Sequence, residues 1–264
     1  MLKRIALPVL FALAFVVVPS VAHAQRKSPL ADAVAIRKRV ELRDLRFELG
    51  AGMATSVNET FYHALMADIH AGFHLTDWLS FSALVSLNAA ELSTGFRDRL
   101  IDSLTPGMQP RRTPDVATTN AGMNKMGMIF AGRAEVTPFT GKYSLFGKLF
   151  AHYDFYAFGG PAYVNLAAKN GGMACSGTPL PQSMSCAATG GHIGGTFGAG
   201  FHSFFNDWVA LNFEVRDILV KDNPAGRDVN GDQFVDTRDL TWTSHLFAIL
   251  GVTIYLPAKA DISP

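Results

Sequence analysis

The chain has 264 residues, 48% of them hydrophobic, and a formal net charge of +1 at pH 7. This near-neutral balance argues against the basic composition of nucleic-acid-binding proteins and gives no reason to expect a strongly anionic ligand. Beyond residue 24, no stretch approaches the ~18 continuous apolar residues that a membrane helix needs. Residence in a membrane would therefore depend on β-strands.

The N-terminus has the pattern of a cleaved export signal. Residues 1–24 begin with the cationic MLKR, continue as an apolar run interrupted by Pro8 and Pro19, and end in Ala-His-Ala, a small-residue cleavage site. We predict a signal peptide over 1–24 that is removed from the mature protein. A retained membrane anchor is the alternative.

Alternation of apolar and polar residues marks the strands. Four runs place apolar side chains at every second position, with mostly polar ones between them, and these runs are 45–53, 65–73, 79–88 and 209–216. Such runs exceed the ~5–6 residues of soluble strands and match the ~9–11 of a tilted membrane strand. Further strands are expected near 124–137, 153–167, 193–205 and 241–256, which gives eight.

The predicted connections alternate between short and long. The short ones at 75–78 and 205–208 share a phrase, GFHLTDW and GFHSFFNDW, whose Trp residues would lie at the periplasmic interface. The long, polar ones are 91–122, 168–192 and 221–240. This asymmetry is typical of outer-membrane barrels. We predict an all-β fold, a closed, antiparallel, up-and-down transmembrane β-barrel of eight strands in the outer membrane of a Gram-negative cell.

The barrel is predicted to span 44–257, with shorter segments around it. Residues 25–43 lack alternation and carry a basic cluster at 37–39, so we expect a solvated periplasmic lead-in. Residues 258–264 form a C-terminal tail. Residues 96–104, FRDRLIDSL, have a helical pattern, which favours eight strands over ten. Residues 138–152 could hold a turn of interfacial helix or continue the strands.

A series of short motifs follows a fixed order along the mature chain. They are RFEL at 46–49, VNETF at 57–61, GK at 141–142, YDFY at 153–156, LGV at 250–252 and YLP at 255–257. In this order they resemble the outer-membrane β-barrel domain family described from myxobacterial-type genomes. The resemblance spans nearly the whole mature chain. It implies the fold and the location, and brings no established activity.

Closing the alternating strands into a barrel turns their polar residues inward. Because an unpaired buried charge is costly, we predict a network of ion pairs that fixes strand register, in preference to a catalytic or ion-conducting role. The residues expected in this network are Arg46, Glu48, Asp68, His70, Arg133, Glu135, Asp154, His202, Glu214 and Arg216.

The segment 228–239, DVNGDQFVDTRD, has the ligand pattern of a twelve-residue calcium loop and looks similar to the loops of dockerin modules. Its candidate ligands are the side chains of Asp228, Asn230, Asp232, Asp236 and Asp239 and the carbonyl of Phe234. Gln233 stands at position 6, where Gly normally makes the sharp turn. We predict a structural calcium ion here. An exposed loop that is merely rich in Asp and Asn is the alternative, and no other cofactor is required.

The two cysteines, Cys175 and Cys186, have ten residues between them, in a stretch rich in Gly, Ser and Pro. An exported chain meets an oxidising compartment, so we expect a disulfide that staples the loop at 168–192. Zinc binding would need further ligands at suitable spacing, and the sequence places none nearby.

These patterns predict a non-enzymatic barrel with a structural or surface-interaction role through its outer loops. Its expected partners are the lipid bilayer of the outer membrane and surface or envelope proteins, and not nucleic acid. A narrow pore or transporter is the first alternative, and it needs more strands or an emptier lumen. A lipid-modifying barrel enzyme is the second, since His70 could meet Ser80 or Ser82 on the polar faces of neighbouring strands.

Overall fold

The computed structural model describes residues 41–104, 115–145, 149–169, 172–175, 178–181, 184–258 and 261–262. The predicted signal peptide and the basic cluster at 37–39 lie outside the described residues.

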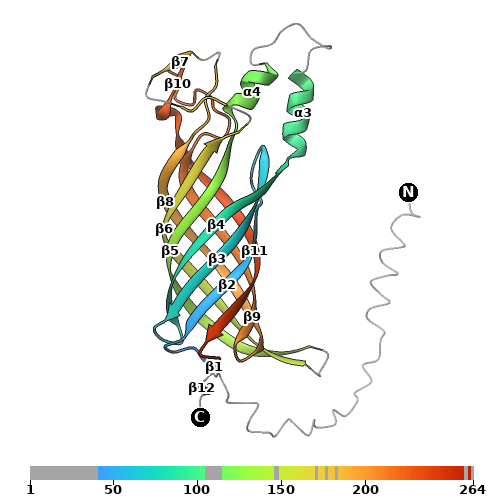
Figure 1. Ribbon diagram of the computed structural model, residues 1–264, viewed down its shortest axis with the longest axis vertical. Helices are drawn as coiled ribbons and strands as arrows, with labels where there is room; N and C mark the ends of the chain where they lie inside the picture. The colour runs from blue at the N-terminus through green and yellow to red at the C-terminus, as the bar shows by residue number, and fades with distance from the viewer. Residues whose placement is uncertain are drawn as a thin grey trace, which may run out of the picture. The chain divides into compact units, whose positions relative to one another are not determined.

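Eight long strands close into a barrel (Figure 1). They are β2 (Phe47–Ser56), β3 (Tyr62–His74), β4 (Leu79–Ser93), β5 (Asn124–Leu145), β6 (Leu149–Ala168), β8 (Gly190–Asn206), β9 (Val209–Asp222) and β11 (Thr241–Leu256). Each of them pairs antiparallel with its neighbours in chain order, and β11 returns to pair with β2, which closes the barrel. The prediction of a closed, antiparallel, up-and-down barrel of eight strands is confirmed.

Alternation decides which side chains face the lumen, because successive residues of a strand point to opposite faces. In β9 the polar Glu214 and Arg216 are buried, whereas the intervening Phe213 and Val215 are 46% and 53% exposed. The same pattern on the other strands surrounds the barrel with an apolar belt. Such a belt suits the hydrocarbon of a bilayer and is unusual on a protein in water.

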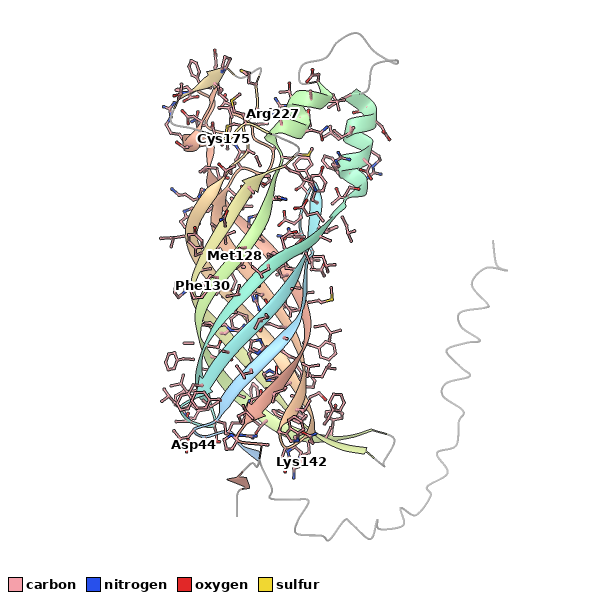
Figure 2. All side chains as sticks on the ribbon, in the orientation of Figure 1. Asp44, Met128, Phe130, Lys142, Cys175 and Arg227 are labelled. Atoms are coloured by element: carbon pink, nitrogen blue, oxygen red, sulfur yellow. A yellow bond between two sulfur atoms is a disulfide. The ribbon has the colours of Figure 1, made fainter. Side chains whose placement is uncertain are left out.

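The short connections lie at one end of the barrel, the turn end. Figure 2 shows Asp44 and Lys142 at this end, opposite Cys175 and Arg227. In the turn between β8 and β9 the side chain of Asn206 accepts hydrogen bonds from the backbone N–H groups of Trp208 and Val209. Both repeated phrases thus end in tight turns, as the sequence predicts.

The turn-end connection between β5 and β6 continues the two strands. β5 and β6 remain paired from Phe139 and Phe155 out to Leu145 and Leu149, and this hairpin projects from the turn end in Figure 1. Over the described residues of 138–152 the strand alternative is therefore right and the interfacial helix is wrong. The physical reason is cross-strand packing of aromatic rings, since the rings of Tyr143 on β5 and Tyr153 on β6 lie 6.0 Å apart across the hairpin.

The long connections lie at the opposite end, the loop end. The described residues between β4 and β5 form α3 (Gly95–Leu104) and α4 (Val116–Gly122). α3 confirms the helical prediction for 96–104. In the part of the chain that the structure describes, no helix is long and apolar enough to cross a membrane.

Two short ribbons complete the described chain. β7 (Leu180–Pro181) pairs with β10 (Phe234–Val235), so the loop that holds the cysteines is joined to the Asp-rich loop, in which the 3-10 helix η2 (Thr237–Asp239) follows. β1 (Glu41–Leu42) pairs with β12 (Asp261–Ile262), which joins the predicted lead-in to the predicted C-terminal tail.

Candidate functional site

The structure places all ten residues of the predicted charge network in the lumen, where each is 1–5% exposed. Their contacts divide most of them between two groups. The central cluster consists of Asp68, Arg133, Glu135, Glu214 and Arg216. The turn-end cluster consists of Glu48, His70, Asp154 and His202, joined by Arg43 and His74.

Glu214 lies in the middle of the central cluster. Its carboxylate accepts hydrogen bonds from Arg133 at 2.7 Å and from Arg216 at 2.8 Å, and the hydroxyl of Tyr156 donates a third at 2.8 Å. Arg216 also donates to Asp68 at 2.8 Å. Charge-assisted contacts therefore cross the lumen between β3, β5, β6 and β9.

Serine hydroxyls supply the remaining partners of the central cluster. Ser82 donates to Glu135 and accepts a hydrogen bond from Arg133 at 2.7 Å, and Ser86 donates to Asp68. Removing one partner of such a buried pair typically costs about 3–5 kcal/mol, because the remaining charge is left uncompensated. A shift of strand register would break several of these pairs at once, so the cluster favours the observed register.

The turn-end cluster is built around two carboxylates. Glu48 contacts the Nε2 atoms of His70 at 3.0 Å and His74 at 2.8 Å. Asp154 accepts a hydrogen bond from Arg43 at 2.6 Å and contacts Nδ1 of His202 at 3.0 Å.

Arg46 lies apart from both clusters, at the turn end itself. Its guanidinium donates to the backbone carbonyls of Asp207 at 2.8 Å and Pro257 at 2.9 Å. It thereby joins the start of β2 to the β8–β9 turn and to the residue that follows β11.

Sequence reasoning missed several members of this network. Tyr156 and His74 continue the inward face by an even number of residues from Asp154 and His70, so the alternation itself could have identified them. Arg43 belongs to the segment assigned to the lead-in, but it is 3% exposed and reaches Asp154 inside the barrel. No alternation precedes Arg43, so the sequence pattern contains no signal for it.

The residues of the hypothetical Ser-His pair are engaged elsewhere. His70 contacts Glu48, whereas Ser80 and Ser82 donate to Glu135. Within the described barrel no hydrogen bond joins His70 to either serine. The Ser-His pair that the lipid-modifying alternative requires is therefore not formed by these residues.

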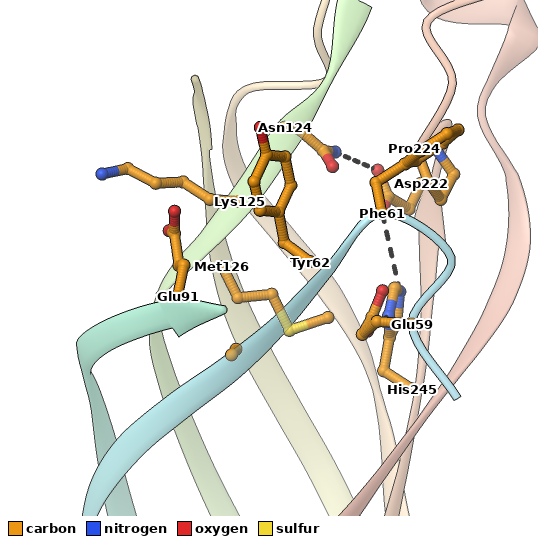
Figure 3. Close-up of a pocket in the computed structure, with 11 residues that line it drawn as sticks. Glu59, Phe61, Tyr62, Glu91, Asn124, Lys125, Met126, Asp222, Pro224 and His245 are labelled. Carbon is orange, nitrogen blue, oxygen red and sulfur yellow. Dashed lines mark hydrogen bonds and ion pairs between the residues drawn. The ribbon is translucent and has the colours of Figure 1, made fainter. Parts of the chain in front are cut away.

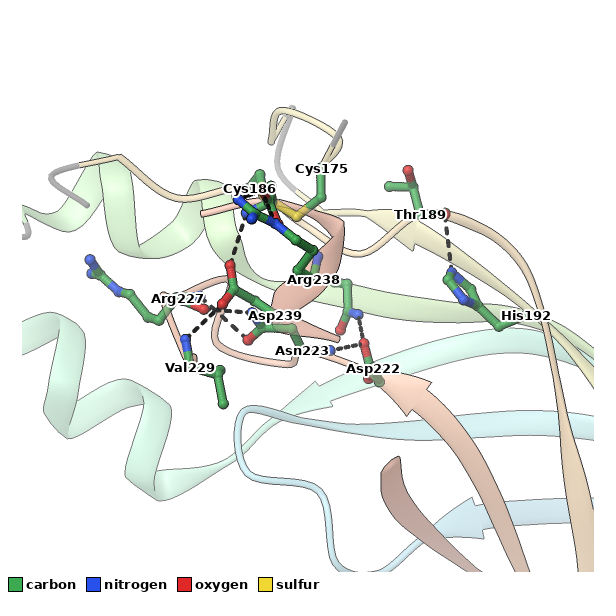
Figure 4. The surroundings of a disulfide bond; sticks show 12 residues. Cys175, Cys186, Thr189, His192, Asp222, Asn223, Arg227, Val229, Arg238 and Asp239 are labelled. Atoms are coloured by element: carbon green, nitrogen blue, oxygen red, sulfur yellow. Dashed lines mark hydrogen bonds and ion pairs between the residues drawn. A yellow bond between two sulfur atoms is a disulfide. The ribbon is translucent and has the colours of Figure 1, made fainter. Parts of the chain in front are cut away.

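The loop end contains the predicted disulfide. Cys175 and Cys186 are bonded, with their Cα atoms 4.8 Å apart, and the backbone N–H of Cys175 donates to the carbonyl of Ala187 at 2.9 Å (Figure 4). The disulfide closes part of the long loop at 168–192, and the β7–β10 pair joins that loop to the one at 221–240.

The backbone of the Asp-rich loop folds much as a calcium loop would. Gln233 has a φ of 69°, the left-handed conformation that Gly usually supplies at position 6. The carboxylate of Asp228 accepts hydrogen bonds from the N–H groups of Gly231 and Gln233, and that of Asp239 accepts from Val229. The substitution at position 6 therefore does not prevent the turn.

Arg238 provides the positive charge within this loop. Its guanidinium lies 2.6 Å from Asp236 and 3.0 Å from Asp232, two of the predicted calcium ligands. Its hydrogen bonds to Asp236 hold the pKa of that carboxyl below its usual value. Among the described residues, no three His, Cys, Asp or Glu side chains are gathered as metal ligands. Calcium binding here stays a prediction.

Comparison with solved structures finds several barrels similar to this chain. The N-terminal β-barrel domain of Pseudomonas aeruginosa OprF is 11% identical, with 81% of this chain and 98% of that chain covered and a TM-score of 0.44. The outer membrane protein OprG from Pseudomonas aeruginosa is 8% identical, with 81% and 97% covered and a TM-score of 0.41. Neisserial surface protein A is 11% identical, with 80% and 96% covered and a TM-score of 0.38.

No family model matches the chain, and no curated protein matches it. The assignment of the fold rests on the strand pairing of this chain. The myxobacterial-type resemblance stays an expectation from the sequence.

Proposed function

We propose that this protein is a non-enzymatic barrel of the outer membrane of a Gram-negative cell, with a structural or surface-interaction role carried by its loop end. The observation that carries the proposal is the contrast between a filled lumen and an elaborated loop end. The central cluster is 1–3% exposed, whereas the described part of the loop end includes α3, α4, a disulfide and a two-stranded ribbon.

The apolar belt supports residence in a bilayer. Only helices and closed barrels satisfy every backbone hydrogen bond within hydrocarbon, and this chain closes its barrel through the pairing of β11 with β2. Leu49, Ile69 and Phe81 on consecutive strands are about half exposed on the outer wall. Lipid is therefore the partner that the barrel wall fits best.

The filled lumen argues against the pore alternative. A water-wide passage through the barrel would leave the side chains around it accessible, yet Arg216 is 1% exposed and Glu214 is 3% exposed. An eight-stranded barrel has an interior that side chains can fill, and here charged side chains fill it. Entry of a small sugar into liposomes that contain the protein would contradict this part of the proposal.

The cross-links at the loop end support an interaction role. A disulfide within the loop at 168–192 and the ribbon of β7 and β10, which joins this loop to the one at 221–240, lower the conformational entropy that a partner would otherwise have to restrict on binding. We propose a surface or envelope protein as the partner of this end.

Intact cells provide the test. External protease should cut the loop end, in the connections between β4 and β5 or between β9 and β11, and leave the β5–β6 hairpin at the turn end uncut until the cells are lysed. The extracted protein should also migrate differently on a gel before and after boiling. Cleavage of the hairpin in intact cells, or the absence of a heat-dependent shift, would overturn the proposed location.

A further inference from the structure

A small cavity with several polar lining residues lies where the lumen opens toward the loop end (Figure 3). Its volume is about 30 Å³, and its lining includes Glu59, Asn124, Asp222 and His245. One buried water needs about 10–15 Å³ of such volume, so the cavity has room for an ion together with water. These residues come from the loop after β2, the start of β5, the end of β9 and the interior of β11.

His245 has one ring nitrogen bound and the other without a hydrogen bond. The residue is 1% exposed, and its Nδ1 lies 2.6 Å from a carboxylate oxygen of Glu59. Its Nε2 is buried with no hydrogen-bond partner, and the facing oxygen, Oδ2 of Asp222, is 3.6 Å away. That distance is too long for a hydrogen bond.

Asp222 is held so that this oxygen faces the gap. Its other carboxylate oxygen, Oδ1, accepts hydrogen bonds from the side-chain amide of Asn124 and from the backbone N–H of Asn223. Asp222 is 2% exposed, so water outside the protein does not solvate Oδ2. A buried nitrogen and a buried carboxylate oxygen therefore face each other without a hydrogen bond between them.

We propose that His245 Nε2 and Asp222 Oδ2 bind a divalent transition-metal ion of the zinc class, with water completing the coordination. Two ligands at about 2.1 Å from a tetrahedral zinc ion lie about 3.4 Å from each other, close to the 3.6 Å found here. Imidazole nitrogen with carboxylate oxygen is a donor set that suits zinc, nickel and copper.

Glu59 acts as the positioning residue of this site. A carboxylate that accepts the Nδ1–H of a metal-binding histidine fixes the tautomer and turns the Nε2 lone pair toward the ion. Glu91 and Lys125 also line the cavity. Glu91 is paired with Lys169, and Figure 3 shows the Lys125 side chain pointing away from Asp222 and His245, so Glu59 and Asp222 are the carboxylates left to balance a divalent cation. The bound metal would tie the loop after β2 to the mouth of the barrel.

The test uses the untagged mature protein, folded in detergent and freed of metal with a chelator. Zn²⁺ is titrated by calorimetry, and Co²⁺ by its visible absorption, which is strong in tetrahedral sites. We expect one equivalent to bind. His245→Gln and Asp222→Asn should each weaken binding at least tenfold, and Glu59→Gln should weaken it about 10-fold, within the range known for partners of metal ligands.

The matched control is His192→Gln, another histidine of the loop end, whose ring contacts a backbone carbonyl. This variant should bind the metals as the wild type does. Absence of saturable binding at millimolar Zn²⁺ would overturn the proposal, as would unchanged binding in His245→Gln or Asp222→Asn. If those two variants fail to fold, as judged by the gel shift, metal binding by Glu59→Gln decides, because Glu59 lies in a loop outside the strands. Binding equal to that of the wild type would then overturn the proposal.

Discussion

Two regions of this molecule contain ion pairs, and they differ in where the partners come from. In the central cluster Arg216 pairs with Asp68, 148 residues away, and both side chains are 2% exposed. In the Asp-rich loop Arg238 pairs with Asp236, two residues away, and its side chain is 61% exposed. The pair in the central cluster joins distant strands, and loss of either partner leaves a buried charge without compensation. The pair in the Asp-rich loop orders a short stretch of chain, where water can also solvate the charge of Arg238.

The largest expected effect comes from breaking the central cluster. Glu214→Gln leaves Arg133 and Arg216 without a shared carboxylate, and should lower the free energy of unfolding by about 3–5 kcal/mol. Urea unfolding of the folded protein in lipid vesicles, followed by the gel shift, measures it.

The control for that variant is Asp217→Asn, on the outward face of the same strand, where the carboxylate accepts a hydrogen bond from Ser244. Its cost should stay below about 1 kcal/mol, as for other exposed charges. Equal losses in the two variants would contradict the distinction between the regions.

Removing the disulfide should have a smaller and more local effect. In a variant with both Cys175→Ser and Cys186→Ser, the loop end should lose about 2–3 kcal/mol of local stability, the scale expected for closing a short loop. Limited proteolysis should then cut between β6 and β8 faster. The urea midpoint of the barrel should stay unchanged. A shift as large as that of Glu214→Gln would show that the stability of the barrel depends on the disulfide at the loop end.

Arg238→Gln tests whether arginine and calcium compete for the same carboxylates. With Arg238 removed, Asp232 and Asp236 lose their cation, so calcium should bind several-fold more tightly than in the wild type. Calorimetry at millimolar calcium gives the comparison. Identical heats of calcium binding in the two proteins would show that Arg238 does not compete with calcium. If neither protein gives a saturable heat, the calcium prediction is wrong.

The smallest expected effect is the response of the Asp-rich loop to pH. The pKa of Asp236 is lowered in the folded protein by hydrogen bonds from Arg238, so its stabilising contribution is present above the unfolded pKa of about 4 and is lost as pH falls through the folded value. Carboxyl NMR of the protein between about pH 6 and about pH 2, a range that brackets the ordinary carboxyl pKa values, should show Asp236 titrating at lower pH than ordinary aspartates. In Arg238→Gln that difference should disappear, and an ordinary titration in the wild type would contradict the pairing.

The two regions also differ in how well the sequence predicts them. Alternation assigns every strand residue to a face, so Glu214 and Arg216 could be placed in the lumen before their partners were known. The partners themselves depend on closure of the barrel, which brings Asp68 across to Arg216. The sequence pattern contains no information on that distance.

At the ends of the barrel the alternation of polar and apolar residues stops, so the sequence predicts the structure there less well. Arg43 precedes the first strand of the barrel and enters the lumen only because its backbone turns at Asp44 and Leu45, the latter with a φ of 55°. β7 and β10 are about 50 residues apart in the chain, and each contributes only two residues to their ribbon. Strands of two residues are too short to show a periodic pattern in the sequence. The metal site proposed at His245 likewise joins four segments, and its residues have no characteristic spacing.

The filled lumen is the central claim, and planar-bilayer recording tests it most directly. Folded wild-type protein, inserted into the bilayer and verified by its gel shift, should give no stable conductance steps, because the central cluster leaves no water-wide passage. Reproducible ohmic steps from the wild-type protein would contradict the account and identify the barrel as a pore.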